Sequence, residues 1–219
     1  SIHPGESMSF PLNRSWSIFA VVFVIVTITR LPFIFDGYGN DGDAWWLATA
    51  ARAISTTGEY RFSRPPGHPL QEIVSSYLWQ YGPIGLNGAT ALLSALGAGF
   101  FVLTLRELGS KRSFLAGAAL ACTPVIWIHS VDAMDYVWAL GFILASFYAI
   151  VRKQTLVGGV LLALAISCRA TSILMIIPLS VFVWQYGRTR AVFLFALTSG
   201  LLGISTYYPA YKVHGDYVF

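Results

Sequence analysis

Long apolar runs dominate the chain, and most charged residues lie in the segments between them. A bilayer core needs roughly 20 apolar residues per helix, whereas the strands of a membrane barrel alternate apolar and polar positions. These runs do not alternate, so the pattern predicts an all-α, polytopic membrane protein. We expect about seven transmembrane helices, at residues 15–35, 86–106, 113–131, 136–151, 155–170, 171–187 and 191–211. The fourth, fifth and sixth are short, so we expect them to tilt, to thin the bilayer or to be partly re-entrant.

The composition supports the same class, because 56% of the 219 residues are hydrophobic and only 11% are charged. A soluble domain carries about 25% charged residues, so this chain lacks the polar surface of a water-soluble globule. The first run, 16–35, is longer than the apolar core of a signal peptide and has no small-residue cleavage site, which predicts a retained anchor. Cys122 and Cys168 lie inside apolar runs without metal-ligand spacing, so we interpret them as buried thiols.

The charged residues sort by side of the membrane once an orientation is chosen. Basic residues beside short loops mark the cytoplasmic side. By that rule the inside set is Arg14, Arg106, Lys111, Arg112, Arg152, Lys153, Arg188 and Arg190. The N-terminal tail, 1–14, is then cytoplasmic, while a long first loop, 36–85, and the tail 212–219 are external.

Most acidic residues then fall on the external side. They are Asp36, Asp41, Asp43, Glu59, Glu72, Asp132, Asp135 and Asp216. Acidic residues contribute little to membrane insertion, so the positive-inside rule does not explain this gathering, and it indicates a function. The net charge of +4, in contrast, reflects topology, and we expect no nucleic-acid partner.

Within the long loop, segment 43–57 has a helical pattern. Trp46 and Ala50 share one face, and tryptophan is enriched at membrane interfaces, so we predict a juxtamembrane amphipathic helix. Asp41 and Asp43 stand at its start, where the simplest interpretation is that one of them caps the helix.

The next segment, 58–70, contains a rigid turn. Two prolines and a glycine at 65–67 favour a tight, extended backbone, and Arg61 and Arg64 flank it. A guanidinium presents a planar fork of donors that suits a phosphate group, so this turn is a candidate phosphate site. The alternative is an ordinary exposed loop with solvated arginines.

Four strings of this loop resemble the first external loop of the GT-C glycosyltransferases: residues 40–46 (NDGDAWW), 50–52 (AAR), 58–60 (GEY) and 63–69 (SRPPGHP). Residues 158–171 (GGVLLALAISCRAT) resemble a helix of that family that ends externally on a basic residue. Members of the family are membrane enzymes that use polyprenyl-phosphate sugars, among them protein O-mannosyltransferases and aminoarabinose transferases.

The resemblance spans about residues 15–211 and implies a module of seven membrane helices with a large first external loop. It also implies a glycosyltransferase, or the membrane module of one, in a bacterial or archaeal plasma membrane. Such an enzyme moves a sugar from a polyprenyl-phosphate donor to an acceptor on the external face. Relatives continue with further helices, so we expect either a piece of a longer protein or a reduced module. The alternative function is a catalytically silent transmembrane subunit of a larger membrane complex.

Transfer from a lipid phosphate needs a base for the acceptor hydroxyl and cations for the departing phosphate. We expect Asp43 as the base, with Asp41 second, because Gly42 interrupts the acidic pair that many relatives carry. Arg64 and Arg169 are the candidates for phosphate stabilisation. Arg169 lies in a nearly continuous apolar stretch, where a charge usually faces a cavity or a partner, although snorkelling at a helix end is the alternative.

Asp132 and Asp135 follow the third expected span in a short loop, which in a GT-C fold faces the first loop. Together with Asp41 and Asp43 they could bind a divalent cation, Mg²⁺ or Mn²⁺, and the alternative is simple helix capping. His68 is a further candidate for substrate contact, with a structural role as its alternative. The expected partners are therefore membrane lipid, a lipid-linked sugar, its acceptor and further membrane subunits.

Overall fold

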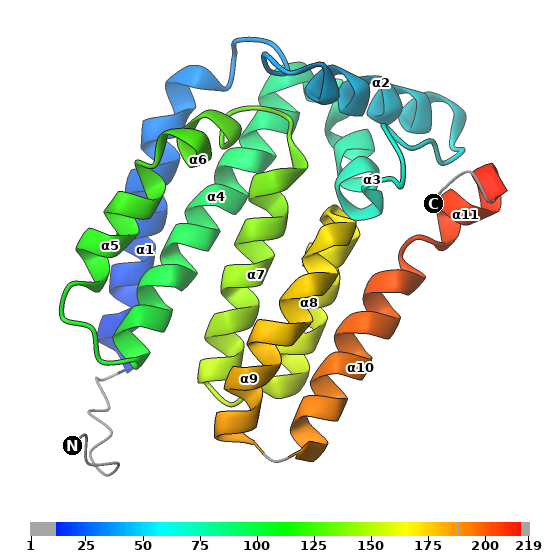
Figure 1. Ribbon diagram of the computed structural model, residues 1–219. Helices are drawn as coiled ribbons and strands as arrows, with labels where there is room; N and C mark the ends of the chain where they lie inside the picture. The colour runs from blue at the N-terminus through cyan, green and yellow to red at the C-terminus, as the bar shows by residue number, and fades with distance from the viewer. Residues whose placement is uncertain (1–11, 188, 216–219) are drawn as a thin grey trace.

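The computed structural model describes residues 12–187 and 189–215, and the regular elements in these two ranges are all helices. The main helices of the bundle are α1 (Leu12–Arg30), α4 (Gly82–Glu107), α7 (Asp135–Val151), α8 (Thr155–Cys168) and α10 (Thr189–Ser205). In Figure 1, α1 packs on α4, α4 on α7, α7 on α8 and α8 on α10. The all-α class predicted from the sequence is confirmed.

Three segments of the described chain are long and apolar enough to cross a membrane: Ser15–Phe33, Pro69–Glu107 and Thr189–Val213. They include most of α1 and all of α4 and α10. The second segment is not one continuous helix. Its backbone turns at Gly82, which has a positive φ of 58°, and α4 begins there. The 26 residues of α4 therefore supply the crossing length in that segment.

The four other expected spans are helical but are short or broken. Three of them are apolar helices of 10–17 residues, at Asp135–Val151, Thr155–Cys168 and Ala170–Gln185. The fourth, 113–131, forms two helices, α5 (Ser113–Ala121) and α6 (Pro124–His129). Proline disfavours helical backbone at the residue before it, and Thr123 is accordingly extended, with ψ of 123°. Three crossing-length segments are thus shown, and seven spans are not.

The first long connection folds over one end of the bundle. Helix α2 (Gly42–Thr57) lies across that end, and α3 (Pro69–Leu78) packs between α2 and α8 (Figure 1). The short helix η2 (Trp79–Tyr81) then leads into α4. Helix α2 covers the predicted segment 43–57. The side chains of Trp45 and Trp46 on it are more than half exposed, while its small residues are buried against the bundle.

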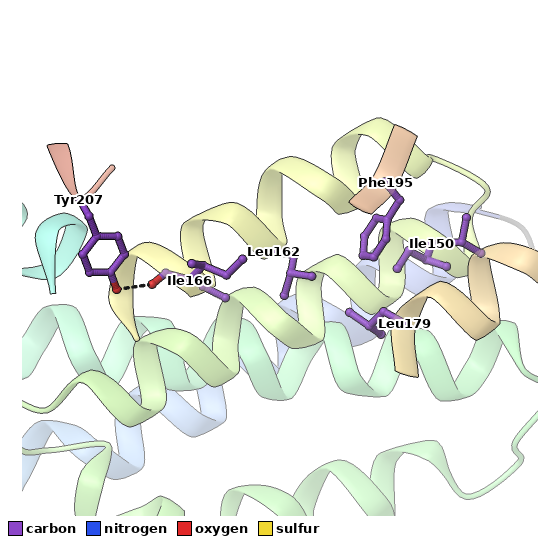
Figure 2. Close-up of a cluster of buried hydrophobic side chains, with 8 residues drawn as sticks. Ile150, Leu162, Ile166, Leu179, Phe195 and Tyr207 are labelled. Carbon is purple, nitrogen blue, oxygen red and sulfur yellow. Dashed lines mark hydrogen bonds between the residues drawn. The ribbon is translucent and has the colours of Figure 1, made fainter. Parts of the chain in front are cut away.

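The core between the last helices is built from large apolar side chains. Helices η3 (Ala170–Met175) and α9 (Ile176–Tyr186) return the chain toward α10, and α11 (Tyr208–His214) follows it. Figure 2 shows Leu162, Leu179 and Phe195 packed together, with the Tyr207 hydroxyl donating a 2.7 Å hydrogen bond to the carbonyl of Ile166. This contact joins α8 to the chain after α10 at the end where α2 lies.

The expected terminal tails fall largely outside the described residues. Helix α1 already begins at Leu12, inside the expected tail 1–14, and α11 extends to His214, inside the expected tail 212–219. Arg188 and Asp216 also lie outside the described residues.

Candidate functional site

Four elements bring charged side chains together under α2. Asp43 comes from the first turn of α2, Arg64 and His68 come from the turn before α3, and Asp135 begins α7. Arg169 follows the last residue of α8. These segments are far apart in sequence. Helices α7 and α8 pack antiparallel, so the start of α7 and the end of α8 lie at the same end of the bundle. Helices α2 and α3 cover that end.

Asp135 is the centre of this cluster, and its side chain is only 2% exposed. Nη2 of Arg64 donates to one carboxylate oxygen at 2.6 Å, and Nη1 of Arg169 donates to the other at 2.7 Å. A buried carboxylate needs such partners, because burial without them carries a desolvation cost of several kcal/mol. The two arginines expected at the phosphate therefore converge on a single carboxylate.

Arg64 also pairs with Asp43 through its other terminal nitrogen. The result is a chain of alternating charge: Asp43, Arg64, Asp135, Arg169. Asp43 and Arg169 have side chains that are 35% exposed, in contrast to Asp135. The network therefore has a buried anchor and an accessible edge where a ligand could meet both a carboxylate and guanidinium groups.

The backbone at the end of α8 directs Arg169 into this network. Arg169 has φ of −155° and ψ of 111°, so it leaves the helical conformation. Its guanidinium carbon lies 4.3 Å from the centroid of the Tyr136 ring, a cation–π contact, while its Nη1 binds Asp135. The charge is thus held between an aromatic face and a carboxylate.

The turn that carries Arg64 is held by Glu72, whose side chain is fully buried. Glu72 accepts hydrogen bonds from the backbone N–H of Ser63 at 2.6 Å and from its hydroxyl at 2.7 Å, and it also accepts one from Tyr60. Burial, reinforced by the negative charge of Glu72, raises the pKa of Tyr60. Gly67 has φ of 99°, and a Cβ there would lie 2.9 Å from the Tyr60 hydroxyl.

Sequence reasoning counted Glu72 only among the external acids. The signal that could have found it is its place in the first turn of α3, four residues after His68 and just after the proline-rich turn.

His68 lies between the two buried carboxylates. Its Nε2 is 3.5 Å from Asp135, and its Nδ1 is 3.9 Å from Glu72. Burial by itself would lower the pKa of His68, but the nearby carboxylates of Asp135 and Glu72 outweigh burial and raise the pKa above its ordinary value. The imidazole therefore favours its charged form beside two anions.

Asp41 and Asp132 lie outside the arginine network. Oδ1 of Asp41 accepts a 3.0 Å hydrogen bond from the N–H of Asp43, so Asp41 is the N-cap of α2 and Asp43 is not. Burial raises the pKa of Asp132, with His129 opposing the shift and Asp41 adding to it. Of the two candidate bases, Asp43 is the one placed beside an arginine.

The expected carboxylate set does not assemble into a cation site. In residues 12–187 and 189–215, no group of three or more His, Cys, Asp or Glu side chains could hold a metal ion. The physical reason is that Arg64 lies between Asp43 and Asp135, while Asp41 caps its own helix. The four carboxylates therefore do not form one shared cation site in the described residues.

We compared the chain with known protein families, curated proteins and solved structures. No family model, no curated protein and no solved structure matches the chain.

Proposed function

We propose that the chain is a GT-C-type glycosyltransferase, or the membrane module of one, that transfers a sugar from a polyprenyl-phosphate donor to an acceptor outside the membrane. The observation that carries the proposal is the network Asp43–Arg64–Asp135–Arg169. In it a buried carboxylate holds two partly exposed guanidinium groups beside a partly exposed carboxylate, which are the groups that this transfer requires.

The reaction assigns a task to each end of the network. The acceptor oxygen forms a bond to the anomeric carbon of the sugar, and the bond from that carbon to the phosphate oxygen breaks. The bonding electrons leave with the phosphate, where Arg64 and Arg169 stabilise the growing negative charge. Asp43, whose Oδ2 pairs with Arg64, takes the proton of the acceptor hydroxyl.

The proposal includes an orientation in which all seven apolar segments lie in the bilayer and the N-terminus is cytoplasmic. The distribution of charge supports this orientation. Figure 1 places the loops that follow α4 and α7 at the end of the bundle opposite α2. Those loops and their flanks carry Arg106, Lys111, Arg112, Arg152 and Lys153, as expected of a cytoplasmic face.

A catalytically silent membrane subunit is the second candidate, and one observation favours it. Each member of the network already has an ionic partner within the protein, as a structural clamp between α2, α7 and α8 would require. A clamp needs charge pairing alone, whereas an enzyme also needs Asp43 to accept a proton.

The Asp43→Asn variant separates the two candidates, with Asp41→Asn as its matched control. Sugar transfer from a labelled polyprenyl-phosphate donor is measured with the full-length protein in liposomes. Loss of a general base lowers the rate by roughly 10²-fold to 10⁴-fold, so Asp43→Asn should remain folded and lose at least that much activity. Asp41→Asn retains an oxygen that caps α2, so it should stay active.

Normal transfer by Asp43→Asn together with an inactive Asp41→Asn would assign the base to Asp41. Normal transfer by both variants would remove the acid–base role from this loop. A folded wild-type protein that transfers no sugar from any polyprenyl-phosphate donor would favour the silent subunit.

A further inference from the structure

A small polar pocket lies on α2 beside the loop that carries Arg64. It has a volume of about 220 Å³. Its lining residues are Trp46, Thr49, Ala50, Arg61, Phe62 and Ser63. Sites for drug-sized ligands usually measure about 300–1,000 Å³, so this pocket suits a smaller ligand, such as a single sugar unit. None of its lining residues belongs to the charge network centred on Asp135.

The pocket lies within about one helical turn of the proposed base. Trp46 follows Asp43 by three residues on α2, and one turn of an α-helix rises about 5 Å. Ser63 directly precedes Arg64, which pairs with Asp43, so the loop and the helix run side by side from the base to the pocket. A ligand in the pocket can therefore extend to the charge network.

Arg61 supplies a cation that has no ionic partner within the protein. In residues 12–187 and 189–215, no carboxylate forms an ion pair with Arg61, in contrast to Arg64. Arg61 is exposed, so a ligand can reach it. A guanidinium offers five N–H donors in a planar fork that fits a carboxylate or a phosphate. This end of the pocket therefore favours an anionic group.

The two hydroxyl groups of the pocket are set to accept hydrogen bonds from a ligand. Oγ1 of Thr49 donates its hydrogen to the Trp45 carbonyl at 2.9 Å. Oγ of Ser63 donates its hydrogen to Glu72 at 2.7 Å. A hydroxyl has a single hydrogen, so both oxygens retain only lone pairs for a ligand. They therefore suit a ligand that donates hydrogen bonds, as the hydroxyl groups of a sugar do.

Trp46 adds an apolar wall to the pocket, and its side chain is 59% exposed. An indole ring presents a large flat apolar face, against which the C–H face of a sugar can pack. The lining contains one aliphatic side chain, Ala50, which is too little surface for the acyl chains of a phospholipid. A cation, two acceptor oxygens and an aromatic face together complement a sugar that carries an acidic group.

We propose that this pocket binds an acidic sugar, that is, a sugar unit with a carboxylate or a phosphate. The anionic group pairs with Arg61, the apolar face packs on Trp46, and the sugar hydroxyls donate to Thr49 and Ser63. On the proposed function, on which this assignment rests, the acidic sugar is a unit of the acceptor, next to the unit whose hydroxyl reaches Asp43. The binding requires no turnover, so it can be measured apart from catalysis.

The probes are methyl glucuronide, which carries a carboxylate, and glucose-6-phosphate, with methyl glucoside as the uncharged control. Saturation-transfer NMR measures their dissociation constants with the full-length protein in detergent. Arg61→Gln removes the charge, and Arg52→Gln, at an exposed position of α2 outside the pocket, is its matched control. Trp46→Leu removes the indole ring, and Trp45→Leu, at an exposed neighbouring position outside the pocket, is its matched control.

The two acidic sugars should bind the wild type at least tenfold more tightly than methyl glucoside, as expected for hydrogen bonds to a charged group. Arg61→Gln should abolish this difference. Trp46→Leu should weaken the binding of all three sugars about fivefold and preserve the difference. Arg52→Gln and Trp45→Leu should bind like the wild type, and thermal unfolding identifies any variant that is misfolded.

Equal affinity of the wild type for methyl glucuronide, glucose-6-phosphate and methyl glucoside would remove the anionic group from Arg61. Unchanged binding in Trp46→Leu would place the sugar elsewhere, and a folded wild type that binds neither acidic sugar would overturn the proposal. Stronger displacement of methyl glucuronide by short-chain phosphatidylglycerol than by glucose-6-phosphate would assign the pocket to a lipid head group.

The transfer assay separates this proposal from the catalytic one. Methyl glucuronide should inhibit sugar transfer by the wild type and not by Arg61→Gln, whereas Asp43→Asn should bind it normally and transfer little sugar. Transfer that depends on Asp43 but is insensitive to methyl glucuronide would contradict the acidic-sugar site alone. Sugar binding that depends on Arg61, in a protein whose transfer does not need Asp43, would contradict the catalytic proposal alone.

Discussion

Replacement of Asp135 by asparagine should be the most damaging single change in the charge network. The variant keeps the size of the side chain but removes its charge, and asparagine can accept a hydrogen bond through only one of its two end atoms. Arg64 and Arg169 then share a site without their common anion, because each of them makes a short contact to the Asp135 carboxylate.

The size of the effect follows from burial. Removal of one partner from a buried ion pair costs about 3–5 kcal/mol. Arg64 and Arg169 are 24% and 35% exposed, so water partly compensates the two cations and the expected loss falls to about 2–4 kcal/mol. A protein with a typical unfolding free energy of about 5–15 kcal/mol would survive this change with visibly reduced stability.

The assay is thermal unfolding in detergent, followed by circular dichroism. At about 2–4 °C per kcal/mol for chains of this length, the midpoint should fall by about 5–15 °C. The control is Glu107→Gln, which breaks the 2.9 Å pair with Arg152 at the opposite end of the bundle. Both members of that pair are about one-third exposed, so the loss there should be at most about 1 kcal/mol. Equal midpoints for the two variants would refute the role of Asp135 as a buried anchor.

Three further changes test the surroundings of the site. Gly67→Ala should cost about 1–3 kcal/mol in unfolding free energy, because φ is 99° and a Cβ would meet the Tyr60 hydroxyl, whereas Gly88→Ala, which meets open space, should be nearly neutral. Because the folded protein holds the proton of His68 more tightly than the unfolded chain does, charged His68 stabilises the folded state fully below about pH 6.5. This stabilisation should be lost as the pH rises through the raised pKa of His68. The thermal unfolding midpoint of the wild type should therefore fall over that pH range, and the midpoint of His68→Gln should stay constant. Tyr207→Phe should lose about 1 kcal/mol by removing the hydrogen bond to the Ile166 carbonyl, which chemical denaturation can measure.

The helices were predictable where the apolar pattern is long and uninterrupted. The apolar runs that form α1, α4 and α10 are long enough to predict helices by themselves. The polar residues of the short loops located most helix ends to within a few residues. The run 113–131 was predicted as one helix although Pro124 lies inside it, and the structure divides it there. Helix α3 was assigned to a loop because its buried face carries polar residues, including Gln71 and Glu72, instead of an apolar stripe.

The residues of the candidate site could be predicted from the sequence, but the ion pairs between them could not. Unusual placement in the sequence singled out Arg64 and Arg169, one beside a proline-rich turn and the other inside an apolar run. The partner of both is Asp135, and no sequence spacing specifies this pairing, because it depends on how α3, α7 and α8 pack. For the same reason the division of labour between Asp41, as the cap, and Asp43, as the ion-pair partner, was left open by the sequence.

The two carboxylates bound by Arg64 differ in the property that matters for the proposed reaction. Asp135 is buried and shared with Arg169, so a ligand that displaced it would remove an anion from two cations at once. Asp43 is partly exposed and holds Arg64 alone, so an incoming phosphate can replace it at that guanidinium. A carboxylate that has lost its cation accepts a proton more readily than a paired one. On the proposed function, donor binding at Arg64 would therefore release Asp43 for the acceptor hydroxyl at the moment when a base is required.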